Sequence, residues 1–352
     1  MKILVINPGA TSTKIAIYED TTEIFKSSVD HSAADLAPFH AVIEQLDYRH
    51  GLIANTLKEA GYKASDFAAV CGRGGLLRHV PSGTYEVNDR MIEDIKNPPY
   101  GEHASNLGAI LAKSFADEAG VNAYIVDPVC VDELTDIARI SGFEGMERQS
   151  FFHALNHKGM ARKAAAQLGK SYEELNLIVV HMGGGVSVAA HEKGRVIDVN
   201  NVKDEGCFSM DRGGSLPVNA IINLCYSGKT KEEVKKMLGS QAGVFSYLGT
   251  RDFLEVQTAA FEKNDVKAKL IFDALVYQHA KDIGTMAAVL KFQVDAIILT
   301  GGMANSKILC SAIESYTSKI APMIILPGEA EMASLAAGAY RVLNGEKTCE
   351  YK

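Results

Sequence analysis

The stretch Leu177 to Val199 reads L-I-V-V-H-M-G-G-G-V-S-V-A-A-H-E-K-G-R-V-I-D-V and predicts three consecutive strands. The apolar run Leu177 to Val180 is typical of a buried strand. Gly183, Gly184 and Gly185 then let the backbone turn sharply, before Val186 to Ala190 and Arg195 to Val199 run as further strands. A turn of bare backbone N–H groups suits an anion such as phosphate. An ordinary tight hairpin is the alternative. The turn is neither a Walker loop nor a Rossmann loop, because no helix follows the glycines directly.

The N-terminus repeats this plan. Lys2 to Ile6 is an apolar strand, and the turn Asn7 to Thr13, N-P-G-A-T-S-T, leads into an alternating strand over Lys14 to Tyr18. Thr22 to Ser28 completes a second set of three strands. Two copies about half a chain apart indicate an internal duplication. The first turn offers Asn, Ser, Thr and Lys side chains, whereas the second offers a histidine and glycines.

Composition narrows the class of protein. The chain has 352 residues, 47% hydrophobic and 22% charged, which suits a globular protein of two domains. A net charge of −7 weighs against non-specific nucleic-acid binding. Six scattered cysteines without a C-x-x-C pair fit reduced thiols in the cytoplasm. With no apolar run of about 18 residues and no secretory leader, we expect a cytoplasmic protein without a membrane partner.

Hydrophobic periodicity predicts the remaining elements. Strands are expected at 67–71, 122–126, 296–299 and 323–326. Helices are expected at 31–62, 104–119, 151–168, 216–238, 267–290 and 332–343. The segment 97–103 is expected as a rigid loop because of Pro98 and Pro99, and 243–252 as a second loop.

Two arginines stand beside glycines, one in each half. Arg73 lies in G-R-G-G (72–75), and Arg212 lies in S-M-D-R-G-G-S-L-P (209–217). Two guanidinium groups converging on a phosphoryl group would neutralise its charge. For Arg73 a surface position in a flexible loop is the alternative.

Other polar side chains follow predicted strands or open predicted helices. Asp127 comes at the carboxyl end of a strand, where α/β sheets place ligand groups, although a turn-forming aspartate is common there. His153 and His157 share one helix face, which points to a catalytic or phosphate-contacting role more than to zinc, with a core histidine as the alternative for one of them. The glycines of T-G-G-M-A (300–304) would let a base or ribose pack on backbone. Glu331 either faces a metal or is simply the acidic residue favoured at a helix start.

Taken together, these motifs resemble the acetate and butyrate kinase family, from L-V-I-N-P-G-A-T-S-T-K to P-G-E-A-E-M-A-S-L-A-A-G. Within it, the N-P-G-x-T-S-T-K and D-R-G-G-S-L-P segments are most similar to members that act on butyrate. The resemblance implies an α/β duplicated actin-like ATPase fold, ribonuclease H-like, with two lobes of mixed five-stranded sheets flanked by helices. Residues 1–125 plus 333–352 would form the N-terminal, substrate-side lobe, and 126–332 the nucleotide-binding lobe. The lobes are expected to close over the substrates.

The resemblance also implies roles for individual residues. The residues implied in catalysis are Asn7, Arg73, Asp127, His153, His181 and Arg212. The residues implied in nucleotide binding are Ser12, Lys14, Gly183, Gly184, Gly185, Arg251, Gly301 and Gly302. Glu331, together with Asp127, is implied in Mg²⁺ binding.

The implied reaction is reversible transfer of the ATP γ-phosphoryl group to butyrate, giving butyryl phosphate and ADP. A carboxylate is ionised near pH 7 and needs no general base, so positioning and charge neutralisation carry the reaction. A homo-oligomer, dimer or larger, is also implied. Acceptors of the same fold, acetate, propionate or a branched acid, are alternatives, as is a non-catalytic ATPase of the actin or Hsp70 type.

The chain departs from the family pattern at three places. Acetate-specific members read R-V-V-H where this chain reads Arg73-Gly74-Gly75-Leu76, so Gly75 is expected to enlarge the acyl pocket by about three carbons. A buried methylene is worth about 0.8 kcal/mol, which predicts a preference for butyrate over acetate. Gly184 replaces the asparagine of H-L-G-N-G, and F-H-A-L-N-H (152–157) replaces F-H-G-T-S-H, which leaves the role of His157 open.

Overall fold

The computed structural model describes residues 1–98 and 100–352 and forms two compact units. The first unit contains Met1–Asp132, Ala154–Gly159 and Ala330–Lys352, and the second contains Glu133–His153 and Met160–Glu329. Within the expected rigid loop, Pro99 lies outside the described residues.

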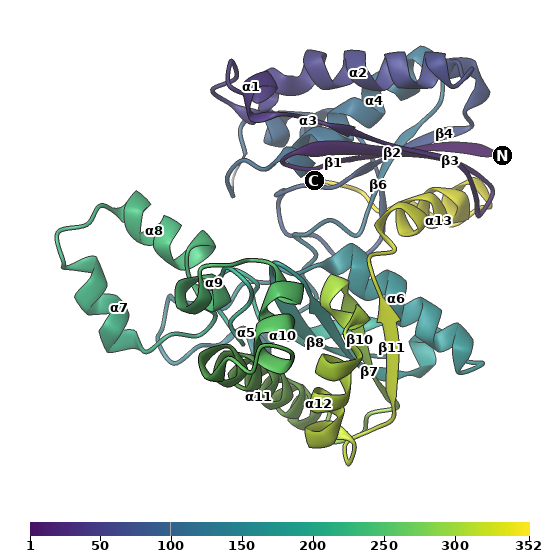
Figure 1. The fold of residues 1–352 in the computed structure, drawn as a ribbon. Helices are drawn as coiled ribbons and strands as arrows, with labels where there is room; N and C mark the ends of the chain where they lie inside the picture. Colours follow the sequence, from purple (N-terminus) through teal and green to yellow (C-terminus); the bar gives the residue numbers. More distant parts are fainter. Residues whose placement is uncertain (99) are drawn as a thin grey trace. The chain divides into compact units, whose positions relative to one another are not determined.

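The first unit is built on a mixed six-stranded sheet in the order β3-β2-β1-β4-β6-β5 (Figure 1). Its strands are β1 (Lys2–Pro8), β2 (Ser12–Glu19), β3 (Thr22–Asp30), β4 (Ala69–Arg73), β5 (Thr84–Glu86) and β6 (Ala123–Val126). The first three strands are antiparallel neighbours, whereas β1, β4 and β6 run parallel. Since parallel strands end at the same edge of a sheet, the ends of β1, β4 and β6 bring Asn7, Arg73 and Asp127 to one edge.

Helices cover both faces of this sheet. The helices of the first unit are α1 (Ala33–Leu36), α2 (Leu46–Glu59), α3 (Asp89–Lys96), α4 (Leu107–Ala119) and α13 (Glu331–Leu343). Apolar residues of β1, β2, β4 and β6 pack against Met332, Leu335, Ala336 and Ala339 of α13. In Figure 1, α2 and α4 lie on the opposite face of the sheet from α13.

The second unit repeats the strand order of the first. Its sheet runs β11-β10-β7-β8-β9, with strands β7 (Asn176–Met182), β8 (Val186–Glu192), β9 (Arg195–Val199), β10 (Ala296–Gly301) and β11 (Met323–Pro327). The neighbours of β8 are antiparallel, and β7, β10 and β11 are parallel, as in the first unit. The predicted internal duplication is therefore confirmed. The first sheet has one more strand than expected, because the three-residue β5 extends its edge.

The helices of the second unit are α5 (Asp136–Arg139), α7 (Val218–Cys225), α8 (Lys231–Ser240), α9 (Gly243–Leu248), α10 (Phe253–Phe261), α11 (Val266–Val289) and α12 (Lys307–Thr317). Of these, α9, α10 and α12 pack against α11. Helix α6 (Ala154–Gln167) divides, with its first six residues in the first unit and the rest in the second. Ile271, Leu275 and Ile283 of α11 join the apolar side chains of β7, β8 and β10 in one core. No helix among residues 1–98 and 100–352 is both long and apolar enough to cross a membrane.

Some predicted boundaries are wrong. The segment 31–62 is not one helix: α1 and α2 are separated by residues that include Pro38, which has no N–H to continue a helix. The segment 243–252 contains the short helix α9 rather than only a loop. Residues 126–132 and 330–332 belong to the first unit, because Val126 pairs with Arg73 in its sheet and α13 packs against that sheet.

Helix α11 carries a histidine in the core of the second unit. The His279 side chain is fully buried, and its Nδ1 donates to the Leu275 carbonyl over 2.8 Å. Its Nε2 has no hydrogen-bond partner among the described residues. Burial penalises the charged imidazolium, which lowers the pKa of His279 from 6.5 to about 4.

We expect His279 to make the folded protein sensitive to acid. His279 takes up a proton near pH 6.5 in the unfolded chain but only near pH 4 in the folded chain. The contribution of neutral His279 to the free energy of unfolding is therefore complete above pH 6.5 and is lost as the pH falls from 6.5 to about 4. The loss amounts to roughly 3 kcal/mol. The thermal midpoint of a His279→Leu protein should therefore fall less between about pH 7 and pH 4.5 than that of the unmodified chain. The exposed His40 provides the control His40→Gln, and equal slopes in all three proteins would contradict the prediction.

Candidate active site

A hydrogen-bonded cluster of Asn7, Arg73 and Glu331 lies at the carboxyl edge of the first sheet. The Arg73 guanidinium meets both carboxylate oxygens of Glu331, with Nη2 at 2.8 Å from Oε1 and Nη1 at 3.0 Å from Oε2. Asn7 Nδ2 donates to Glu331 Oε2 over 2.7 Å, and Arg73 Nη1 donates to Asn7 Oδ1 over 3.3 Å. Asn7 and Glu331 are buried, while Arg73 is partly exposed. A guanidinium has five N–H donors, so its Nε–H and one Nη2–H stay available to an anion.

Close backbone packing explains the glycines around Arg73. A Cβ on Gly72 would lie 2.0 Å from the Gly108 carbonyl oxygen of α4. A Cβ on Gly74 would lie 2.5 Å from the Pro128 Cβ, and one on Gly75 would lie 2.2 Å from Asn106 Oδ1. The expectation that Gly75 opens space for a longer acyl chain is therefore wrong, because Asn106 occupies that space.

Asp127 organises the loop after β6. Its Oδ1 accepts hydrogen bonds from the Ser82 hydroxyl at 2.6 Å and from the Gly83 N–H at 2.9 Å. The side chain is buried, and the backbone has a φ of +39° that residues with a Cβ rarely adopt. Such strain persists where the surroundings enforce it and is common at functional sites.

In the second unit, His153 and His181 form a stacked pair of imidazoles. Their ring centroids are 3.8 Å apart with an angle of 15° between the planes. His153 Nδ1 lies 2.9 Å from Ser187 Oγ, and His181 Nε2 lies 3.8 Å from Glu329 Oε1. His181 is only 2% exposed, whereas His153 is partly exposed. Within this pair, His153 is thus the more accessible side chain. His157 is fully buried in α6.

The glycine turn between β7 and β8 lies directly beside Arg212. A Cβ on Gly185 would meet Arg212 Nη1 at 2.8 Å, and one on Gly183 would meet His181 Nε2 at 3.3 Å. Gly184 is exposed and faces open space. The turn is closed by a bond from the Gly183 N–H to the Gly185 carbonyl, and the Gly184 and Gly185 amides donate to no other described residue. These amides and the Arg212 guanidinium make a site suited to an anion.

Gly301 continues this site from β10. Its φ is +86°, and a Cβ there would lie 2.3 Å from the Met182 carbonyl oxygen, so only glycine fits beside the glycine turn. Gly301 and Gly328 also exchange two backbone hydrogen bonds. Gly302 is exposed with open space at its Cα.

Arg251 and Arg212 both lie close to the carboxylate of Asp211. The Arg251 guanidinium is 3.6 Å from the centroid of the Phe245 ring and donates to the Ser240 carbonyl over 2.6 Å. Asp211 lies 3.9 Å from the Nε of Arg251 and 3.9 Å from the Nε of Arg212. Arg251 is thus held in the same loop system as Arg212.

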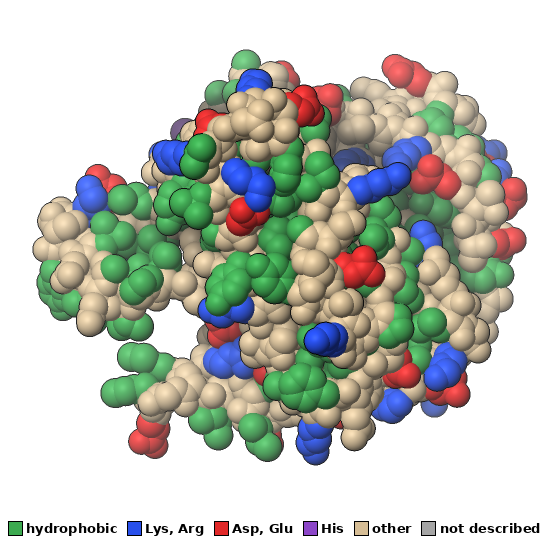
Figure 2. Space-filling model, turned by 60° about the horizontal axis from the view of Figure 1, so that its bottom comes forward, with side chains coloured by type: hydrophobic (Ala, Val, Ile, Leu, Met, Phe, Trp, Pro, Cys, Tyr) green, Lys and Arg blue, Asp and Glu red, His purple; other side chains and the backbone are tan. Residues whose placement is uncertain are grey.

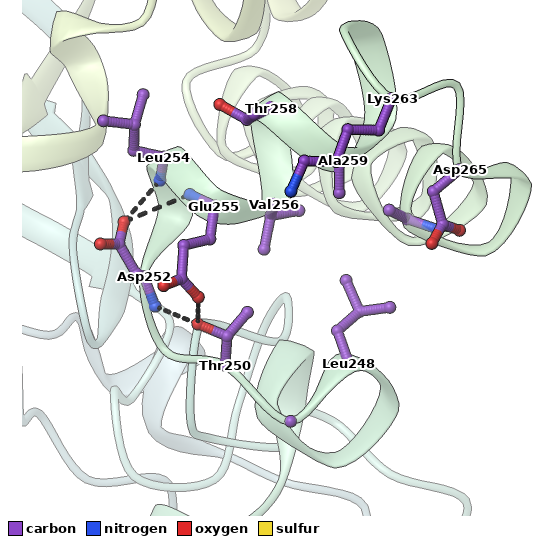
Figure 3. Close-up of a pocket in the computed structure, with 12 residues that line it drawn as sticks. Leu248, Thr250, Asp252, Leu254, Glu255, Val256, Thr258, Ala259, Lys263 and Asp265 are labelled. Carbon is purple, nitrogen blue, oxygen red and sulfur yellow. Dashed lines mark hydrogen bonds between the residues drawn. The ribbon is translucent and has the colours of Figure 1, made fainter.

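Residues next to Arg251 line an open cavity of about 630 Å³ between α9, α10 and the start of α11 (Figure 3). Asp252 caps α10 through the Leu254 and Glu255 amides, and Thr250 donates to Glu255. None of the predicted site residues lines this cavity. Two of its polar side chains, Asp252 and Asp265, cap α10 and α11.

The remaining predicted residues belong to the first turn. Ser12 begins β2, and its carbonyl accepts from the Gly9 N–H over 2.7 Å. Lys14 is exposed and pairs through its backbone with Asn7. No sequence motif pointed to Ser82, Asn106, Ser187 or Glu329, because only the packed chain brings them beside the predicted residues.

The contact between Gly185 and Arg212 can be tested with a matched pair of variants. Gly185→Ala should push the Arg212 guanidinium aside and lower kcat by about 10-fold or more, since small misplacements of a charged group are costly. Gly184→Ala adds the same methyl group to open space and should keep kcat within about twofold. Steady-state kinetics of both proteins gives the comparison, and equal rates would contradict the role of this contact.

The duplicated sheets, with a small-residue turn after the first strand of each, place the chain in the actin-like ATPase fold class. Solved structures agree: the chain superposes on an acetate kinase from Porphyromonas gingivalis with a TM-score of 0.80 at 18% identity, covering 97% of this chain and 99% of that one. A propionate kinase from Francisella tularensis gives a TM-score of 0.75 at 19% identity, covering 96% and 98%.

Sequence comparisons identify the family. The model of the acetokinase family matches residues 144–321. Butyrate kinase 1 of Clostridium acetobutylicum is 51% identical over 100% of this chain and 99% of its own length. A probable butyrate kinase of Listeria monocytogenes is 50% identical over 99% of both chains. The chain belongs to the acetokinase family.

Proposed function

We propose that this protein transfers the γ-phosphoryl group of ATP reversibly to butyrate, giving butyryl phosphate and ADP. The observation that carries the proposal is the identity of about half of all residues, over the whole chain, with proteins named butyrate kinases. The motifs shared with the acetate and butyrate kinase family imply the same reaction. The charged clusters of the two units contain the groups that such a transfer needs.

In this reaction a butyrate carboxylate oxygen bonds to the γ-phosphorus while the bond to the β-phosphate oxygen breaks. The carboxylate is already ionised, so no residue needs to remove a proton. Arg73 would use its remaining N–H groups on the phosphoryl or carboxylate oxygens, and Asn7 would hold its orientation. Arg212 and the amides of the glycine turn would bind phosphate oxygens, and His153 would add a donor.

Mg²⁺ is the expected partner of the nucleotide. No group of three or more His, Cys, Asp or Glu side chains gathers to hold a metal in the described part of the chain. Mg²⁺ is commonly bound by one or two carboxylates together with substrate phosphates and water. Glu331, at the start of α13, would serve as one such carboxylate only by giving up a present contact, because its Oε1 meets Arg73 and its Oε2 meets both Arg73 and Asn7. Asp127 is engaged through Oδ1, which accepts from Ser82 and Gly83 and supports a positioning role.

The decisive experiment measures acid-dependent ATP turnover by the purified full chain. Acetate, propionate, butyrate and isobutyrate are offered with ATP, and the acyl phosphate is trapped as its hydroxamate. We expect butyrate to give the highest kcat/KM. A higher kcat/KM for another acid would make that acid the acceptor instead of butyrate. ATP hydrolysis that no acid stimulates would favour an ATPase of the actin or Hsp70 type.

We also propose a cytoplasmic homo-oligomer. All six cysteines are free thiols, which supports a reducing compartment. Helix α7 buries none of its residues, although it carries Val218, Ile221 and Ile222. Figure 2 shows hydrophobic side chains gathered over the projecting α7–α8 part of the second unit. Sedimentation equilibrium should give a mass of at least two chains, and an Ile222→Glu protein should sediment as a smaller species.

A further inference from the structure

Helix α2 contributes a buried arginine to the turn after β1. Arg49 is 1% exposed. Its Nη1 donates to the Gly9 carbonyl over 3.0 Å and to Thr13 Oγ1 over 2.8 Å, and lies 3.5 Å from the Ser12 carbonyl. Its Nε and Nη2 both donate to Gln45 Oε1, at 3.0 and 2.9 Å. One guanidinium thus ties the turn of residues 9–13 to the start of α2.

His31 completes this network from the end of β3. A guanidinium can only donate, so Thr13 Oγ1 accepts from Arg49, and the same hydroxyl forms a hydrogen bond with His31 Nε2, 2.8 Å away. The His31 backbone N–H donates to the Thr11 carbonyl over 2.8 Å. Burial, followed by the nearby Arg49 charge, lowers the pKa of His31 and so favours the uncharged ring.

The charge of Arg49 has no carboxylate partner. Its hydrogen bonds go to two carbonyls, one hydroxyl and one amide, and no Asp or Glu of the described residues forms an ion pair with it. Burial of an unpaired cation costs several kcal/mol. The same turn offers the Ala10 and Thr11 amides, which donate to no described group. Both residues are exposed.

We propose that Arg49 is a positioning residue for anion binding at the first turn: it fixes the Gly9 and Ser12 carbonyls and the Thr13 hydroxyl so that the Ala10 and Thr11 amides face a phosphoryl oxygen. Its unneutralised charge beneath the turn adds to the attraction for that anion. The inference rests on the proposed function for the identity of the anion, a phosphoryl group. Its physical content, binding of phosphate at this turn, can be measured separately.

The first test is a titration of the ¹⁵N-labelled full chain with inorganic phosphate, followed through the Ala10 and Thr11 amide signals. Phosphate should shift both signals in the unmodified chain. In Arg49→Gln the same shifts should need at least about 10-fold more phosphate, because the charge is lost and the turn loosens. Lys58→Gln removes an exposed cation of the same helix and should leave the titration unchanged. Unchanged phosphate affinity in Arg49→Gln, or no shift at these amides in the unmodified chain, would overturn the proposal.

Kinetics then separates positioning from a general effect on folding. Arg49→Gln should lower kcat by about 10-fold or more and change the KM for ATP by less than about threefold, since the lost interactions act on the transferred group. Arg49→Lys keeps the cation and should recover part of kcat; a kcat equal to that of Arg49→Gln would overturn the role of the charge. If Arg49→Gln does not fold, Gln45→Met serves in its place, because it loosens the guanidinium but keeps its charge. Gln45→Met should weaken phosphate binding, and unchanged binding would overturn the proposal.

The two readouts also distinguish this inference from the proposed function. Arg49-dependent phosphate binding without butyrate-dependent turnover in the unmodified chain would reject the function and keep the inference. Butyrate-dependent turnover that Arg49→Gln leaves unchanged would support the proposed function and reject the inference about Arg49.

Discussion

Replacement of Arg73 by alanine is expected to lower butyrate-dependent kcat by at least about 10²-fold, the scale of one lost donor to a developing negative charge. Arg73 meets both oxygens of the Glu331 carboxylate and still has two N–H groups for a substrate anion. Alanine removes those donors and leaves a carboxylate that is only 7% exposed with Asn7 as its neutral partner. We therefore expect a loss of stability as well as of activity.

A matched control separates these two losses. Arg78 pairs with Asp94, another buried carboxylate of the first unit, at 2.6 Å. Arg78→Ala leaves Asp94 with Tyr351 and Arg90, so it should lower the thermal midpoint less than Arg73→Ala and leave kcat within about threefold. The Arg73→Ala, Glu331→Gln double variant should regain stability, because it no longer carries the unpaired charge of Glu331. It should not regain kcat, because the guanidinium donor is still missing. Full activity of a folded Arg73→Ala protein would reject the role of Arg73.

Arg212→Ala is expected to cost a comparable factor, at least about 10²-fold in kcat. The Arg212 guanidinium lies against Gly185 and is anchored by a bond from Nη1 to the Val202 carbonyl of 3.2 Å. It is thereby held beside the free amides of the glycine turn. Alanine leaves these amides in place, so we expect the effect on kcat to exceed the effect on the KM for ATP.

Arg195 is the control for this second arginine. It is exposed at the start of β9, and Arg195→Ala should leave both kinetic constants within about twofold. Arg212→Lys should recover only part of the loss, since a lysine presents a point charge instead of a planar fork. An Arg212→Ala protein with the kcat of the unmodified chain would contradict the assignment.

Strand periodicity predicted the framework of both units. The glycine turn, its N-terminal counterpart and the strands that flank them lie where alternating and apolar runs placed them, because the side-chain period of a strand is a local property. Elements without a strong local pattern were missed. The three-residue β5 and the helices α9 and α10 are examples, since neighbouring chain stabilises such short segments more than their own sequences do.

The candidate site was only partly predictable for a related reason. Arg73 and Arg212 stood out beside glycines, but their partners come from distant parts of the chain: Glu331 is 258 residues from Arg73. Asn106 could not be foreseen beside Gly75, and the expected acyl space is filled for that reason. Arg49 had no local motif at all, because its position in α2 is that of any helical arginine until the helix is packed against the turn.

The sequence by itself thus determined the duplicated plan, the two phosphate-type turns and the residues able to neutralise a phosphoryl group. These depend on residue type and spacing, which the chain carries locally. Only the tertiary structure decided which donors point at which turn. It placed Arg212 over Gly185, Arg49 beneath Gly9 and Ser12, and Glu331 against Arg73. A hydrogen bond needs its donor and acceptor within about 3.5 Å, and screened charges interact weakly beyond about 10 Å, so these contacts form only after strands and helices far apart in sequence have packed together.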